Sequence, residues 1–223
     1  MLQPLVLALA LASVPEVAIE INSESGISAT GELIAVYDNR LAEEVLGDLQ
    51  EHGVTASILR GEVARPGTRL AVRLNHHAIP AAWVKQGHAD AFYGFALGIA
   101  QSNPDQATTI SCTRLVGTAL REAGEIPSLY KSFKMPGLDQ PLLDEALGIH
   151  FAKGDEELLH RNGAVMNLEV GIVSSQGESR RLANPVVVAG IADAIASGIH
   201  ECFQPGEAEE DEADDFIDKD MFK

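Results

Sequence analysis

The spacing of hydrophobic residues in the first third of the chain predicts two kinds of element. The segment Glu16–Ile21 alternates between polar and apolar residues, which is typical of a strand. From Asp38 to His52 the apolar residues recur on one helical face and Gly53 follows, so this segment predicts an amphipathic helix. Val54–Leu59 and Leu70–Leu74 are short apolar segments that predict further strands. Strand, helix and strand in succession indicate a layered α/β fold.

Four more apolar segments extend this pattern through the rest of the chain. Ala91–Ala100 and Val165–Val173 have the composition of buried strands, and Thr108–Gly124 and Pro185–Phe203 have the spacing of helices. We therefore expect one domain over residues 15–204, a three-layer α/β/α fold with a mostly parallel or mixed central sheet. A chain of 223 residues is long enough for one such well-buried domain.

The N-terminal end of the chain differs in composition from this domain. Residues 1–14 form an apolar run that is too short to span a bilayer, and no transmembrane span is predicted. The run contains the small-x-small sequence Ala10-Leu11-Ala12, which is typical of a secretory signal peptide, although the positively charged start is missing. A signal peptide would place the mature protein in the periplasm or outside the cell. The alternative is a buried first segment that leads into the first strand.

Acidic residues dominate the C-terminal end and the charge of the whole chain. From Glu207 to Lys223 there are nine acidic residues and two lysines, which predicts a disordered acidic tail over residues 205–223. The tail either keeps the protein in solution or binds a basic partner. The formal net charge of −17 argues against nucleic acid as a ligand, because its phosphates would be repelled.

Few residues are candidates for cross-linking or metal binding. Cys112 and Cys202 allow one disulfide if the protein is exported, and are buried thiols if it is not. No CxxC or Cys–His cluster is present, which excludes a zinc ribbon. In the stretch VRLNHHAIP (Val72–Pro80) the adjacent His76 and His77 follow an apolar strand, which suggests a metal site.

One carboxylate stands out because of its neighbours in the sequence. Glu169 lies between Leu168 and Val170 in a segment that predicts a buried strand. A carboxylate there costs several kcal/mol unless it is paired, protonated or bound to a metal. Glu169 is therefore a candidate functional residue. The alternative is a glutamate on an edge strand, reaching solvent.

Two motifs in this order carry a resemblance to a known family: GISATG at residues 26–31 and LEVGIVSSQGESRRL at residues 168–182. With the strand-end histidines between them, the chain resembles the zinc-dependent N-acetylmuramoyl-L-alanine amidases of the amidase_3 type over about Val17–Phe203. The resemblance implies an amidase_3-like fold and a place in the bacterial cell envelope. Similar family sequences also tend to carry cysteines near Cys112 and Cys202, which favours the disulfide.

The resemblance also implies a set of site residues. In that family a histidine, a glutamate and a second histidine hold one zinc, and another glutamate acts as general base on the zinc-bound water. That water attacks the amide between muramic acid and L-alanine. The three ligand positions map onto Asn22, Ala35 and Asn75 of this sequence, and the base maps onto Glu169. We therefore expect vestigial ligand positions, a vestigial base and no zinc or other cofactor.

The function that we expect is that of a catalytically degenerate amidase, a pseudoenzyme that serves as a peptidoglycan-binding or structural and assembly subunit. Its partner would be peptidoglycan or an envelope protein. The alternative is an active zinc-dependent amidase with relocated ligands, in which His76 binds the metal and Glu20, Glu24 or Glu32 supplies a carboxylate. In a third reading the chain is an unrelated α/β protein, and the two motifs would lie far apart.

Overall fold

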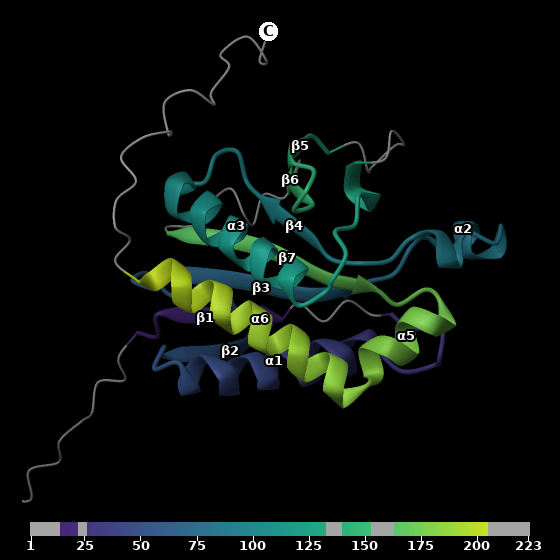
Figure 1. The fold of residues 1–223 in the computed structure, drawn as a ribbon, viewed down its shortest axis with the longest axis horizontal. Coiled ribbons are helices and arrows are strands. Elements are labelled where there is room, and N and C mark those ends of the chain that lie inside the picture. Colours follow the sequence, from purple (N-terminus) through teal and green to yellow (C-terminus); the bar gives the residue numbers. More distant parts are fainter. Residues whose placement is uncertain (1–13, 22–25, 133–139, 153–162, 205–223) are drawn as a thin grey trace, which may run out of the picture.

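The computed structural model describes residues 14–21, 26–132, 140–152 and 163–204 (Figure 1). The expected acidic tail, and all of the expected signal segment except Val14, lie outside these residues. Within them the chain forms a mixed sheet with flanking helices, which confirms the predicted α/β class.

Seven strands of the described chain form one sheet. They are β1 (Val17–Ile21), β2 (Ala56–Arg60), β3 (Leu70–His77), β4 (Ala96–Ile99), β5 (Leu142–Asp144), β6 (Ile149–Phe151) and β7 (Ala164–Ile172). Their order across the sheet is β2-β1-β3-β7-β4-β6-β5. The first four in this order are parallel, β4 runs antiparallel to β7 and parallel to β6, and β5 is antiparallel to β6. The central position therefore belongs to β7.

Three long helices pack side by side along one face of this sheet (Figure 1). They are α1 (Ile34–Glu51), α3 (Gln106–Glu122) and α6 (Pro185–Phe203), with α6 between the other two. The shorter elements are α2 (Ala81–Lys85), α5 (Gln176–Ala183) and the 3₁₀ turns η1 (Ala89–Ala91) and η2 (Tyr130–Ser132).

The two faces of the sheet differ in chemistry because successive residues of a strand point to opposite sides. Leu74 in β3 and Leu168 in β7 belong to the buried core beneath the long helices, and each is followed by a polar residue. The other side of the sheet, which we call the polar face, carries these polar side chains. Its described polar side chains include Ser57 of β2, Glu20 of β1, Arg73 and Asn75 of β3, His150 of β6, and Asn167 and Glu169 of β7.

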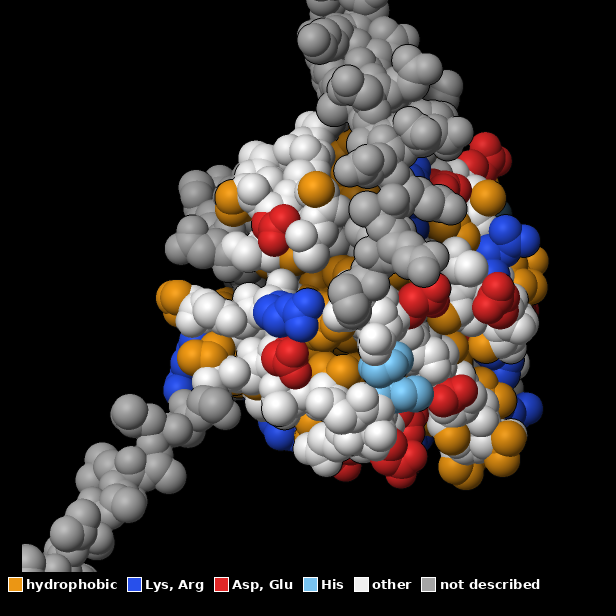
Figure 2. Space-filling view, turned by 60° about the vertical axis from the view of Figure 1, so that its left-hand side comes forward, with side chains coloured by type: hydrophobic (Ala, Val, Ile, Leu, Met, Phe, Trp, Pro, Cys, Tyr) orange, Lys and Arg blue, Asp and Glu red, His pale blue; other side chains and the backbone are white. Residues whose placement is uncertain are grey.

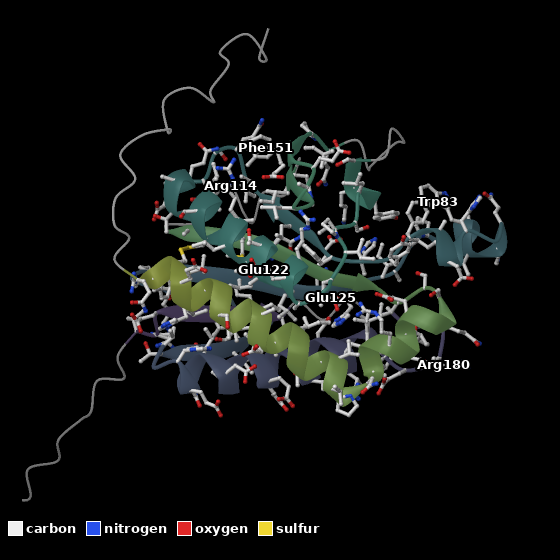
Figure 3. All side chains as sticks on the ribbon, in the orientation of Figure 1. Trp83, Arg114, Glu122, Glu125, Phe151 and Arg180 are labelled. Atoms are coloured by element: carbon white, nitrogen blue, oxygen red, sulfur yellow. A yellow bond between two sulfur atoms is a disulfide. The ribbon has the colours of Figure 1, made fainter. Side chains whose placement is uncertain are left out.

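The helix α6 is the centre of the helical layer. The Asn184 side chain caps it by accepting a hydrogen bond from the Val186 N–H, and Pro185 occupies its first turn. By length and composition alone α6 is apolar enough to cross a membrane. It packs between α1 and α3, however, and Cys202 near its end forms a disulfide with Cys112 of α3 (Figure 3). These contacts identify α6 as a core helix, and the predicted disulfide is present.

Some boundaries differ from the sequence prediction. The first helix begins at Ile34 rather than Asp38, because Ile34 and Tyr37 are buried on the same face as the later apolar residues. The strand predicted to end at Leu74 continues through His77, because β7 pairs with it through Asn75 and, after a register shift, again at His77. A hydrophobic pattern does not show that a strand continues through polar residues, because there the hydrogen bonds of the neighbouring strand hold it in place.

The strand predicted over Ala91–Ala100 is shorter and lies at Ala96–Ile99. The turn η1 ends at Ala91, where the predicted strand begins, and Gly94 follows with a φ of +86°. A Cβ at Gly94 would lie 2.1 Å from the Ile126 carbonyl oxygen, so the chain needs glycine there. The elements α2, α5, β5 and β6 were not predicted, because they are too short to show a clear period.

Candidate functional site

Asn75 and Glu169 are neighbours across two parallel strands. Asn75 of β3 pairs in register with Glu169 of β7, and the preceding pair, Leu74 and Leu168, faces the core. Asn75 and Glu169 therefore both point to the polar face. The structure thus brings together one position mapped as a vestigial ligand and the position mapped as the base.

Glu169 is held by a lysine that the sequence reasoning missed. The Lys131 ammonium nitrogen of η2 lies 2.7 Å from the Glu169 Oε1, and their side chains are 17% and 9% exposed. The alternative of a solvent-reaching glutamate on an edge strand is wrong, because β7 is the central strand. An ion pair compensates a buried carboxylate. Nothing in the spacing of the sequence marks Lys131, because only the fold brings η2 to β7.

A buried histidine lies on the same face as this ion pair. A Cβ built on Gly98 would lie 3.3 Å from the Nε2 atom of His150 and 3.4 Å from the Cβ of Asn167. Burial lowers the pKa of His150 to about 4; the Lys131 charge also lowers it, and the Glu169 charge opposes the shift. His150 is therefore a neutral hydrogen-bonding group near pH 7.

Aromatic rings border the ion pair on the side of His77. The His77 ring lies 5.3 Å from the Tyr130 ring, which contacts the Phe92 ring at 5.0 Å. Trp83 packs 5.7 Å from Phe92, on the segment carrying α2 that extends away from the three long helices (Figures 1 and 3). Burial, and then the Glu169 charge, raise the pKa of Tyr130. The site thus combines one ion pair, neutral polar groups and an aromatic wall.

His76 points away from this site, although it is adjacent to His77 in the sequence. Its ring packs 5.5 Å from Tyr37 of α1. Its backbone N–H donates a hydrogen bond to Asp38 Oδ1 at 2.7 Å, and its Nδ1 lies 2.9 Å from the same oxygen. Both residues are buried, and Asp38 Oδ2 has no hydrogen-bond partner. The structure therefore pairs His76 with Asp38 on the helical side and not with Glu169.

The other positions named from the sequence lie apart or outside the described residues. Ala35 sits in the first turn of α1, where its carbonyl accepts a hydrogen bond from the Asn39 amide at 2.6 Å. Asn22 and Glu24 are outside the described residues. Glu32 forms an ion pair with Arg40 at 3.2 Å.

The side chains at these positions offer few donor atoms for a metal ion. The Ala35 side chain has no donor atom, Asn75 offers a neutral amide, and Glu169 is already engaged by Lys131. Zinc in proteins takes thiolate, imidazole or carboxylate ligands. Within residues 14–21, 26–132, 140–152 and 163–204, no three His, Cys, Asp or Glu side chains are placed to share a metal ion. The described donor set does not fit zinc.

The two motifs that carry the family resemblance are in contact. The Ala29 N–H donates to the Val173 carbonyl at 2.9 Å. Tyr37 of α1 also links the two motifs, because its hydroxyl lies 3.1 Å from the Thr30 hydroxyl and donates to the Ser179 carbonyl at 3.1 Å. An unrelated fold required the two motifs to lie far apart, and that expectation is wrong.

Arg181 anchors the second motif to the loop after α3. Its guanidinium contacts both carboxylate oxygens of Glu125 at 2.7 and 2.9 Å and also binds Glu178 of the same helix. These hydrogen bonds raise the pKa of Arg181. Such bidentate geometry holds α5 against the loop after α3.

A second group of titratable side chains lies at the opposite end of the molecule. The rings of His52 at the end of α1 and His200 in α6 stack 4.9 Å apart. Burial, followed by the charge of Asp193, raises the pKa of Asp48 nearby. Figure 2 shows histidine and acidic side chains gathered on this side of the molecule. This group lies at the amino-terminal edge of the sheet, away from Glu169.

Comparison with solved structures places the fold among N-acetylmuramoyl-L-alanine amidases. The apo form of Ami1 from Mycobacterium abscessus matches with a TM-score of 0.62 and 13% identity, over 84% of this chain and 98% of that chain. CwlD from Clostridioides difficile, solved in complex with the GerS lipoprotein, gives 0.59 and 12% over 84% and 98%. AmiC2 of Nostoc punctiforme gives 0.54 and 17% over 85% and 98%. No protein-family model and no curated protein matches the chain. The likeness confirms the predicted amidase-like fold.

Proposed function

We propose that this chain is a catalytically degenerate, amidase-like protein of the bacterial cell envelope, which binds peptidoglycan as a structural or assembly subunit. The observation that carries the proposal is the ion pair between Lys131 and Glu169, beside Asn75. A general base must have a free oxygen close to the water that it deprotonates. In this chain the Oε1 atom of the carboxylate at the base position is held by a cation on a neighbouring turn.

The donor chemistry at the mapped ligand positions supports the same proposal. Ala35 cannot coordinate a metal, and neutral amides at Asn22 and Asn75 are poor zinc ligands beside imidazole and carboxylate. No step of hydrolysis is therefore assigned to a metal in this protein.

The polar face supports a binding role. Asn75, Asn167 and the neutral His150 present hydrogen-bonding groups without net charge, and the Tyr130 ring borders them. Few polar groups beside aromatic rings are typical of sites that bind sugars and peptides. CwlD was solved with a lipoprotein, and an envelope protein is accordingly the second kind of partner proposed for this chain.

Three measurements on one preparation test this function. Zinc is measured by elemental analysis after purification without chelator, hydrolysis by release of labelled fragments from sacculi, and binding by sedimentation with sacculi. We expect far less than one zinc per chain, no hydrolysis above the blank, and retention on sacculi. Glu169→Gln should release no more labelled fragments than the wild type, because the wild type is already at the level of the blank. The matched control Glu122→Gln, on the exposed side of α3, should give the same result (Figure 3). Failure to bind sacculi would overturn the peptidoglycan role.

One contact favours the alternative of an active zinc amidase with relocated ligands, although the same contact places His76 on the helical side of the sheet, away from Glu169. Asp38 engages the Nδ1 atom of His76, and metal-ligating histidines commonly have a carboxylate on their second nitrogen. That alternative predicts about one zinc per chain, lost in His76→Ala. It also predicts hydrolysis that Glu169→Gln abolishes. The zinc content therefore separates the two functions.

A further inference from the structure

The ion pair on the polar face has unequal partners. Glu169 is fixed on the central strand, whereas Lys131 lies on the turn η2 and reaches the carboxylate from outside the sheet. The Lys131 side chain is the more exposed of the two, and its long stem allows the ammonium group to change partner. Lys131 is thus the exchangeable half of the pair.

Unpaired polar atoms lie next to Lys131 in the chain and in space. The Gln140 N–H donates a hydrogen bond to the Lys131 carbonyl at 3.0 Å. The Ser132 hydroxyl oxygen and the Gln140 side-chain oxygen are both buried without a hydrogen-bond partner. Buried polar atoms are satisfied in most proteins, so atoms left open indicate a ligand or a bound water. Two buried oxygens without partners therefore belong to residues whose backbones adjoin that of Lys131.

His150 is placed to respond if Lys131 leaves Glu169. Gly98 of β4 pairs with His150 on one side and with Asn167 on the other. Because Gly98 has no side chain, the His150 ring leans across β4 toward β7. Glu169 is two residues further along β7 on the same face, close enough for its charge to act on the imidazole.

We propose that this group binds a carboxylate of a peptide ligand, with Lys131 turning from Glu169 to the ligand and His150 taking up one proton. The inference rests on the peptidoglycan-binding function proposed above and names the ligand group that the site recognises. The bound carboxylate brings one negative charge into the site and the solvent supplies one proton, which bonds to the imidazole. The net charge of the occupied site is then the same as that of the empty one.

The proton is required because a buried carboxylate without a cation is costly. The Glu169 charge raises the pKa of His150 and the Lys131 charge lowers it, so removal of Lys131 favours the imidazolium. The strand β4, which lies between, contributes no charged side chain. The described charged groups that act on His150 are Glu169 from β7 and Lys131 from η2.

Calorimetry with a matched pair of probes tests the inference. The probes are N-acetylmuramyl-L-alanyl-D-glutamate and the same compound with both carboxyl groups converted to amides. At pH 7 the acid should bind the wild-type protein at least about tenfold more tightly than the amide. Titration in phosphate and in Tris should show uptake of about one proton per acid bound.

Variants separate the role of Lys131 in binding the carboxylate from the role of His150 in taking up the proton. Lys131→Gln should lose the preference for the acid, and Lys131→Arg should keep it because the cation remains. His150→Gln should keep the preference for the acid but take up no proton. A nuclear magnetic resonance titration of the His150 ring should show its pKa rising on binding, a change that a merely structural histidine would not show.

Folding defects do not prevent the test. If Lys131→Gln leaves Glu169 uncompensated and does not fold, the double variant Lys131→Gln/Glu169→Gln carries no buried charge and should show the same lost preference. Equal binding of acid and amide by wild type, absence of proton uptake, or retention on sacculi with no binding of either probe would each overturn the inference. Those outcomes leave the proposed function standing, whereas failure to bind sacculi would overturn both.

Discussion

Asp38 in α1 accepts two hydrogen bonds from His76 in β3 on a single carboxylate oxygen. The backbone N–H of His76 donates at 2.7 Å and the ring Nδ1 lies at 2.9 Å, with both side chains buried. The pair joins the first helix to the end of the strand that carries Asn75. It therefore fixes one wall of the candidate site from the helical side of the sheet.

Asp38→Ala should lower the free energy of unfolding by about 2–4 kcal/mol, because it leaves buried hydrogen-bonding groups of His76 unpaired. Urea unfolding followed by circular dichroism measures the loss. The exposed Asp193→Ala on α6 is the matched control and should change stability by no more than about 0.5 kcal/mol. An Asp38→Ala protein as stable as wild type would contradict a structural role for the pair.

His150 should make stability depend on pH between about 4 and 6.5. Its pKa is about 4 in the folded protein and has an ordinary value of 6.5, so the unfolded chain binds more protons in this window. The free energy of unfolding should thus rise with pH from about 4 to 6.5, by about 3 kcal/mol for this group. Its contribution is fully present above pH 6.5 and is lost as the pH falls toward 4.

The check is a series of urea unfolding curves from pH 4 to pH 7 on wild type and His150→Gln. The difference between the two proteins should shrink as the pH falls, because only the wild type loses the contribution of the neutral imidazole. His88→Gln, an exposed histidine outside the site, is the control and should follow the wild-type curve. Parallel curves for wild type and His150→Gln would show that His150 is not buried in its neutral form.

The disulfide between Cys112 and Cys202 should contribute about 4 kcal/mol to stability, because it closes a loop of 90 residues in the unfolded chain. Thermal unfolding of wild type with and without reductant measures the effect. The double variant Cys112→Ala/Cys202→Ala should unfold at a lower temperature and show no response to reductant. A wild-type melting temperature that reductant leaves unchanged would mean that the bond is absent from the protein in solution.

Two glycines should respond in opposite directions to the same substitution. Gly94→Ala should destabilise the protein by more than about 2 kcal/mol, because φ is +86° and the new Cβ would meet the Ile126 carbonyl oxygen at 2.1 Å. Gly47→Ala should stabilise it by about 0.5–1 kcal/mol, since Gly47 is in α1 with open space around it. Denaturation midpoints of the two variants measure this contrast. If Gly94→Ala left the stability unchanged, the turn before β4 would have a different backbone conformation.

The sequence by itself determined the elements whose signal is local. Helices and long strands are marked by periods of neighbouring residues, so β7 and α6 were located to within a residue. The isolated acid Glu169 was recognised because its apolar neighbours make a carboxylate costly there. The cysteine pair and the order of the two family-like motifs were also visible, and they led to the disulfide and the fold.

Only the tertiary structure decided what those residues contact. It pairs Lys131 with Glu169 and places the His150 ring next to Gly98. It also separates the two adjacent histidines, because His76 bonds to Asp38 and His77 packs against Tyr130. The sheet order β3-β7-β4-β6 brings these residues together from distant parts of the chain, and no local period records such an encounter. Ion pairs and pKa shifts depend on the distances between groups in space, and the order of residues along the chain does not give those distances.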